Sequence, residues 1–148
     1  GVKNVGAGHN LPTGVGDFRE LWLDITVKDR TGKVVFESGK LKEDGNLGED
    51  ARPFMKVYGD KDGKPVGLLF WRYEKLLSDS RIKAGERRIE SYEIKIEDGE
   101  KLQYPLTAIV KLNFRIYPQW VTTAVQKTYP QLPNPPVVEL EKIIQEFN

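Results

Sequence analysis

The sequence predicts an all-β protein: an immunoglobulin-like antiparallel β-sandwich with a short helical, proline-rich C-terminal tail. Several short segments alternate apolar and polar residues, glycine-containing turns separate them, and no strand–helix–strand alternation is present. The chain has 148 residues, which is enough to bury one hydrophobic core. We therefore expect residues 1–148 to form a single domain.

The clearest strand covers residues 19–28. Apolar residues at every second position alternate there with mostly polar ones, as in a half-buried strand: Leu21, Leu23, Ile25 and Val27. A turn at residues 29–32 and a β-prone run at residues 33–38 follow, so the pattern predicts a β-hairpin.

Further strands are predicted beyond a long polar loop at residues 39–53. Residues 54–58 and 66–71 flank a turn-rich stretch and indicate a second hairpin, whereas residues 72–82 fit no single pattern. Residues 89–96 form the next expected strand, followed by a turn at Asp98 and Gly99. Alternation over residues 106–115 predicts a long, central strand.

The C-terminal part changes in character after Pro118. Residues 119–129 can form a helix, and residues 130–136 are rich in proline. Asn134 and Pro135 resemble an N-cap followed by proline at the first helical position. Apolar residues then recur at helical spacing: Leu140, Ile143, Ile144 and Phe147. We expect this tail to pack on the sheet or on a partner.

Composition excludes several classes of function. The 23 basic and 22 acidic residues are interspersed, so nucleic acid is not an expected partner. The chain contains no cysteine, which excludes disulfides, a thiolate nucleophile and a CxxCH haem-attachment site. Apolar runs are far shorter than the roughly 20 residues of a membrane span. We expect no cofactor bound covalently within these residues.

The only histidine, His9, lies in an unusual loop of glycine, asparagine and proline at residues 6–14. Glycine lets a backbone approach a ligand closely, and proline restricts the freedom of the loop. One interpretation is that His9 only hydrogen-bonds to its own backbone. The other is that the loop presents the imidazole to a metal held elsewhere, which makes His9 the candidate metal and cofactor ligand.

Other candidate sites are weaker. A hydrolase would combine His9 with an aspartate and a serine such as Ser38, but no serine lies in a strained GxSxG nucleophile turn, so we expect no enzyme. Residues 60–63 match only the start of a calcium loop, and a hairpin turn explains them. The three tryptophans could form a platform that stacks on sugars or could fill the core: Trp22, Trp71 and Trp120.

One ordered set of residues spans most of the chain. It begins with residues 4–14, and its further residues are Arg19, Leu21, Trp22, Leu23, Val27, Asp29, Gly32, Val34, Val35, Ser38, Gly39, Asp44, Gly45, Asp79, Ser80, Arg81, Ile82, Gly85, Glu86, Leu112, Asn113, Phe114 and Arg115. In this order the set resembles the β-sandwich region that follows the haem-binding part of bacterial multihaem c-type cytochromes.

This resemblance implies a non-catalytic accessory domain of an electron-transfer protein in the bacterial periplasm or outside the cell. The chain looks like part of a longer protein, and any haem c is expected upstream of Gly1. The haem-bearing domain of the same polypeptide is then the expected partner, with other redox proteins as further partners. His9 would be the distal ligand of one haem. The alternative is a stand-alone adhesion or carbohydrate-binding module.

Overall fold

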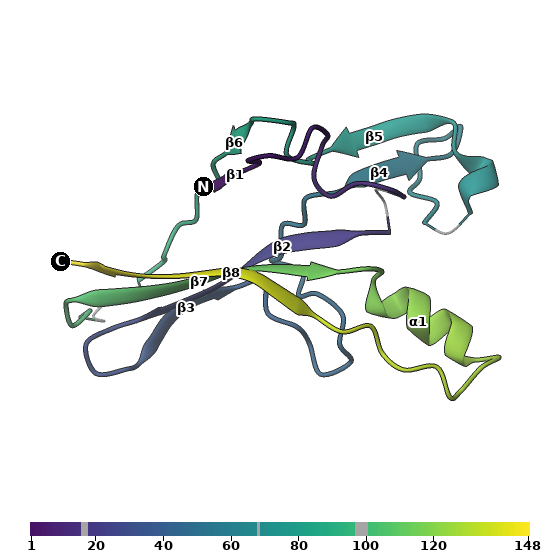
Figure 1. The fold of residues 1–148 in the computed structure, drawn as a ribbon. Helices are drawn as coiled ribbons and strands as arrows, with labels where there is room; N and C mark the ends of the chain where they lie inside the picture. The colour runs from purple at the N-terminus through teal and green to yellow at the C-terminus, as the bar shows by residue number, and fades with distance from the viewer. Residues whose placement is uncertain (16–17, 68, 97–100) are drawn as a thin grey trace.

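The computed structural model describes residues 1–15, 18–67, 69–96 and 101–148 and has mostly β-strands and one α-helix (Figure 1). The turn predicted at Asp98 and Gly99 lies outside the described residues. All strand pairs in the described sheets are antiparallel. The predicted all-β, sandwich-like class is therefore confirmed.

The largest sheet has four strands in the order β3-β2-β7-β8. It contains β2 (Glu20–Lys28), β3 (Val34–Ser38), β7 (Leu106–Arg115) and β8 (Val138–Phe147). β2 pairs with β7 along its whole length, from Glu20 opposite Arg115 to Lys28 opposite Thr107. The hairpin of β2 and β3 and the long strand β7 confirm the predictions for these segments.

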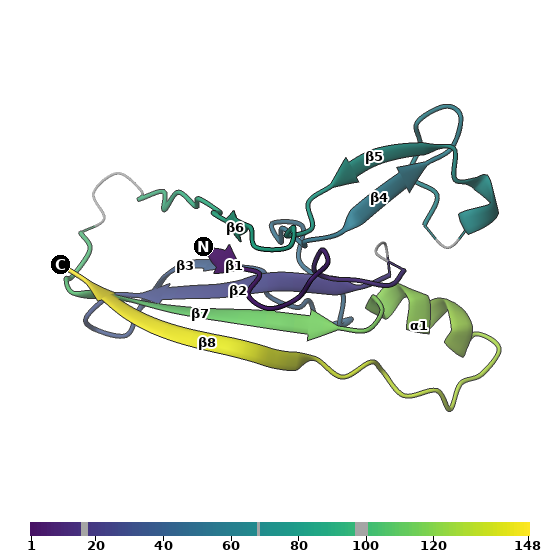
Figure 2. The same ribbon diagram turned by 45° about the horizontal axis from the view of Figure 1, so that its top comes forward.

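Two short sheets lie on one side of this main sheet (Figures 1 and 2). β1 (Val2–Lys3) pairs with β6 (Arg87–Arg88), and β4 (Lys56–Gly59) pairs with β5 (Lys75–Asp79). A short 3-10 helix, η1 (Phe70–Arg72), connects β4 to β5, and the helix α1 (Gln119–Gln126) follows β7. The helix predicted at residues 119–129 is thus confirmed for its first eight residues.

The core lies between the main sheet and the short strands above it. The four alternating apolar residues of β2 are all buried, and Phe54, Ile82, Leu106 and Ala108 complete the cluster. Leu112 and Phe114 pack against this cluster but are only partly buried. The layer above the sheet therefore leaves part of β7 uncovered.

The opposite face of the sheet holds a buried ion pair. Arg115 Nε donates to Glu20 Oε2 at 2.7 Å, and Arg115 Nη1 donates to the carbonyl of Gly45 at 2.7 Å. Burial raises the pKa of Glu20, and the charge of Arg115 opposes this shift. Beside the pair, Trp22 is fully buried, and its indole N–H donates to the Gly39 carbonyl at 2.9 Å.

Two predictions for the middle of the chain are wrong. The partner of β4 is residues 75–79, not residues 66–71, which include η1 and form no strand among the described positions. Residues 89–96 form no regular strand, although Tyr92 and Ile94 pack against the core. In residues 89–96 the apolar spacing reflects contact with the core, which does not require a paired strand. In residues 66–71, by contrast, Phe70 and Trp71 are exposed.

The helix predicted after Asn134 and Pro135 is also wrong, because residues 138–147 form β8 and pair with β7. A β-bulge between Leu112 and Asn113 shifts the register of this pair. The shift breaks the alternation in β8, since Val138 opposes Phe114 whereas Ile143 opposes Val110. The resulting spacing of apolar residues is the one that the sequence pattern assigned to a helix.

Candidate functional site: the histidine loop and the adjoining groove

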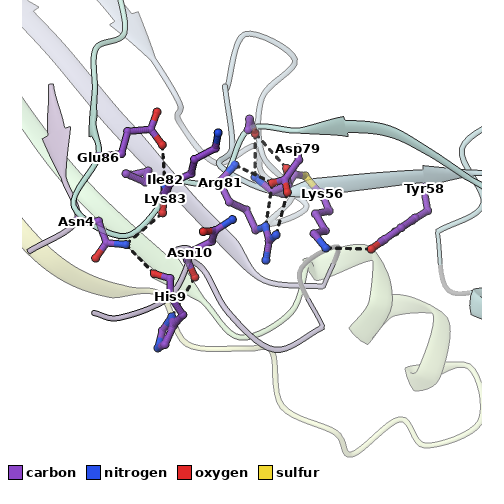
Figure 3. A network of polar contacts seen from close by, with 12 residues as sticks. Asn4, His9, Asn10, Lys56, Tyr58, Asp79, Arg81, Ile82, Lys83 and Glu86 are labelled. Carbon is purple, nitrogen blue, oxygen red and sulfur yellow. Dashed lines mark hydrogen bonds and ion pairs between the residues drawn. The ribbon is translucent and has the colours of Figure 1, made fainter. Parts of the chain in front are cut away.

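The structure brings the loop at residues 6–14 against residues 79–86 (Figure 3). The backbone groups of Leu11 and Ile82 exchange two hydrogen bonds of 2.8 Å each. Gly6 has a φ of 85°, a conformation that glycine adopts without strain. These contacts fix both ends of the turn that carries His9.

Asn4 holds the loop in place. Its side chain is 1% exposed, and its Nδ2 donates to the His9 carbonyl at 2.8 Å and to the Ile82 carbonyl at 3.2 Å. Its backbone also exchanges hydrogen bonds with Glu86 and Gly85. A single buried amide therefore ties β1, the His9 loop and the 79–86 segment together.

The 79–86 segment is itself braced by ion pairs. Arg81 contacts both carboxylate oxygens of Asp79, at 2.9 and 2.8 Å, and this interaction lowers the pKa of Asp79. The Lys83 backbone N–H donates to Glu86 at 2.7 Å and lowers the pKa of that carboxyl group. The support under the His9 loop thus consists of short-range contacts that fix its backbone.

The His9 ring itself is exposed. Its Nδ1 lies 3.1 Å from the carbonyl oxygen of Asn10, an acceptor, so the hydrogen bond requires a proton on Nδ1. In the neutral ring, Nε2 then carries the free lone pair. A Cβ added at Gly6 or at Gly8 would meet no atom of a non-neighbouring residue within 4 Å, so the loop is open at these two positions.

A groove adjoins this loop. One part, of about 380 Å³, is lined by residues 11–14, by Leu21 of β2 and by Leu112 and Phe114 of β7. Two cations, Lys3 and Arg19, also line it. A second part, of about 500 Å³, shares Val2, Lys3, Leu112 and Leu140 with the first and continues along β8. The uncovered region of the sheet thus forms a mainly apolar depression with the His9 loop at one end.

Neither of the other sites considered from the sequence has this arrangement. The carboxylate of Asp60 accepts hydrogen bonds from the backbone of Asp62 and Lys64 and pairs with Arg72, as expected for a structural turn. Ser38 is buried and donates to the carbonyl of Asp50. In the described part of the chain, no group of three or more histidine, aspartate or glutamate side chains could hold a metal ion.

The tryptophans are divided between core and surface. Trp22 is buried, whereas Trp71 is 69% exposed and Trp120 is 41% exposed. The Trp71 ring meets the exposed Phe70 ring at an interplanar angle of 81°, so the two rings do not form a flat platform. Neither Trp71 nor Trp120 lines the groove, and His9 itself lies outside its lining, which takes residues 11–14 from the loop.

Asn4 is the residue at this site that sequence reasoning assigned no role. It was visible only as the first residue of the segment that carries the family resemblance. An asparagine after a short apolar run gives no sign that it is buried, because its partners lie up to 78 positions away. The resemblance did mark both halves of the contact, residues 4–14 and residues 79–86.

Comparison with solved structures found a similar fold in a penta-heme cytochrome c552 from Thermochromatium tepidum. The TM-score is 0.62 at 20% sequence identity, and the match covers 94% of this chain but 33% of the cytochrome chain. The fold of this chain therefore resembles a part of a larger multihaem protein. No protein-family model matches the chain. No curated protein matches it either.

No helix in the described residues is long and apolar enough to cross a membrane.

Proposed function

We propose that the chain is a non-catalytic accessory domain of a multihaem c-type cytochrome and that His9 supplies the distal ligand of one haem. The observation that carries this proposal is the state of the His9 ring, which is exposed with Nδ1 bonded to a carbonyl and Nε2 free. The similarity of the fold to part of a penta-heme cytochrome supports the same assignment.

A single imidazole, that of His9, fits a haem that is anchored on another domain. Such a haem would take only this one imidazole from the chain, so no cluster of ligands is required here. A ligating imidazole is commonly oriented by a hydrogen bond from its second nitrogen to a carbonyl. In this chain the Asn10 carbonyl does so, and Asn4 fixes the backbone of His9.

The groove is the proposed contact with the haem-bearing domain. Its apolar lining, which includes Leu112 and Phe114, would be removed from water on docking. Lys3 and Arg19 at its border would meet carboxylates of the partner, including those of a haem. A bound haem would supply the redox chemistry, and the residues of this chain would orient the ligand, exclude water and hold the two domains in register.

The remaining parts of the proposal follow from the same assignment. The chain catalyses no bond-making step, and it works in the periplasm or outside the cell, where c-type cytochromes act. Its first partner is the haem-bearing domain of the same polypeptide, and other redox proteins dock on the assembled protein.

The test is a titration of the 148-residue chain into a ferric haem c peptide whose iron has one histidine ligand and an open sixth position. Because His9 is the only histidine in the chain, imidazole ligation can come from no other residue. We expect a shift of the visible and electron paramagnetic resonance spectra from high spin to low spin. The shift should saturate at a lower concentration than with free N-acetylhistidine, because the groove adds contact area.

The matched control is His9→Ala, which should leave the spectrum high spin at every concentration. A second variant, Leu112→Lys, keeps the imidazole but places a charge in the groove, and it should need more protein for the same shift. A wild-type chain that produces no more low-spin haem than His9→Ala does would contradict the proposal.

A carbohydrate-binding or adhesion module is the alternative, and the exposure of Phe70 and Trp71 is the observation that favours it. A protein that stacks a sugar on an aromatic side chain loses affinity for that sugar when the side chain is truncated. If the chain binds oligosaccharides in a glycan array and Trp71→Ala abolishes that binding, the alternative is supported. Absence of glycan binding by the wild-type chain would reject it.

A further inference from the structure

β8 is an edge strand with one neighbour in the main sheet (Figures 1 and 2). All ten of its residues are exposed, and its far edge carries backbone N–H and C=O groups that no strand in the described residues pairs. Such an edge is a template for a further strand.

Natural edge strands are usually short or interrupted by proline, bulges or inward-facing charges. β8 has ten residues without proline, and half of them are large apolar residues that are exposed on the surface. These residues are Val138, Leu140, Ile143, Ile144 and Phe147. The only bulge interrupts its pairing near Leu112, so the segment after it presents a regular edge.

We infer that β8 pairs antiparallel with β8 of a second copy of this chain and joins two four-stranded sheets into one continuous sheet. A second copy is the partner because the charges of β8 are self-complementary in one antiparallel register. This inference does not use the His9 ligand, and the residues that set the register, Lys142, Ile144 and Glu146, do not line the groove, so it does not rest on the proposed function.

The symmetry of such a pair restricts the register. Two identical antiparallel strands in one sheet are related by a two-fold axis perpendicular to the sheet, so one residue must lie opposite itself. An axis at Glu141 or Lys142 places like charges opposite each other. An axis at Leu140 places Glu139 opposite Glu141 and is also unfavourable.

The remaining positions of the two-fold axis differ in the residue that they place opposite Lys142. An axis at Ile143 or Gln145 leaves Lys142 opposite an uncharged residue. An axis at Ile144 places Lys142 opposite Glu146 of the second copy, and the symmetry makes this pair twice. Charge complementarity therefore selects Ile144 as the central residue.

The sheet register places these three side chains on one face. Lys142 opposes Lys111, Ile144 opposes Ile109, and Glu146 opposes a residue two positions from Ile109, so all three project from the same side of the sheet. The axis would then bring Ile144 against its symmetry mate, with Ile109 beside each. An apolar centre flanked by two ion pairs would stabilise the joined sheet.

Charge reversal tests the inference on the 148-residue chain by sedimentation equilibrium. The wild type should dimerise, and Lys142→Glu or Glu146→Lys alone should weaken dimerisation by about tenfold or more, because two pairs become repulsive. The double variant Lys142→Glu, Glu146→Lys should restore dimerisation. Lys64→Glu, at an exposed position between β4 and β5, is the matched control and should have no effect.

A cross-link tests the register independently. The chain has no cysteine, so Ile144→Cys introduces a single thiol at the proposed axis. Oxidation or a short bis-maleimide should yield a covalent dimer, whereas Val34→Cys, which is on the opposite edge strand, should not. A wild-type chain that remains monomeric at millimolar concentration would overturn the inference. A dimer whose dissociation constant is unchanged by the single reversals would overturn it as well.

Discussion

Replacing Asn4 with alanine should loosen the His9 loop and destabilise the whole domain. The side chain donates two hydrogen bonds, at 2.8 and 3.2 Å, and is 1% exposed. Each such bond contributes about 0.5–1.5 kcal/mol. The Ile82 carbonyl keeps a second donor, the Leu11 backbone N–H, so the variant leaves only the His9 carbonyl to find a new partner.

The expected loss is therefore about 1–3 kcal/mol in the free energy of unfolding. For a chain of this size, that corresponds to a decrease in Tm of roughly 2–12 °C. Urea unfolding followed by tryptophan fluorescence measures the free energy, because Trp22 lies in the sheet core. Lys3→Ala, at the exposed neighbouring position, is the matched control. A loss below about 0.5 kcal/mol for Asn4→Ala would refute the claim that this amide holds the loop.

Three further predictions concern the scaffold. Leu23→Ala should cost about 2–5 kcal/mol in a urea melt, because it opens a cavity in the β2 face of the core; a loss under about 0.5 kcal/mol would contradict its placement. Arg115→Ala should lower the free energy of unfolding by about 3–5 kcal/mol at pH 7, because Glu20 stays buried without its partner. This loss should shrink at acidic pH, where Glu20 is neutral. A loss that does not depend on pH would contradict this prediction. The Thr31 hydroxyl lowers the pKa of Asp29 below its ordinary value of 3.8, so Asp29 stabilises the fold above that pH and loses this effect as pH falls through its folded pKa. Asp29→Ala should therefore lower Tm at pH 7, and its difference from the wild-type Tm should shrink as pH falls through the folded pKa of Asp29. A difference in Tm that does not depend on pH would refute that role.

The sequence predicted the parts of the fold whose signals are local. β2 and β7 have apolar residues at every second position because each has one face on the core, and the turn at Asp29 is fixed by bonds within a few residues. The sequences of β5 and β8 do not show the alternation that marks a strand. Every residue of β5 is exposed, and the bulge in the β7–β8 pair removes the regular alternation. Both strands exist because a distant strand pairs with them.

The candidate site was predictable only in part. The composition of the loop singled out His9, and the bond from Nδ1 to the Asn10 carbonyl matches the requirement for a free second nitrogen. The groove could not be read from the sequence, because it depends on how far the short strands cover β7. Leu112 and Phe114 have the pattern of core residues, yet they are only partly buried because they line this groove.

Under the proposed function, the most direct measurement is the electron paramagnetic resonance spectrum of the proposed multihaem cytochrome with this chain as its accessory domain, compared with its His9→Ala variant. Loss of a strong axial ligand leaves the sixth position to water or empty, which favours high-spin iron. The proposal predicts that one haem changes from low spin to high spin, while the other haems keep their signals. Identical spectra of the two proteins would contradict the assignment of His9 as a haem ligand.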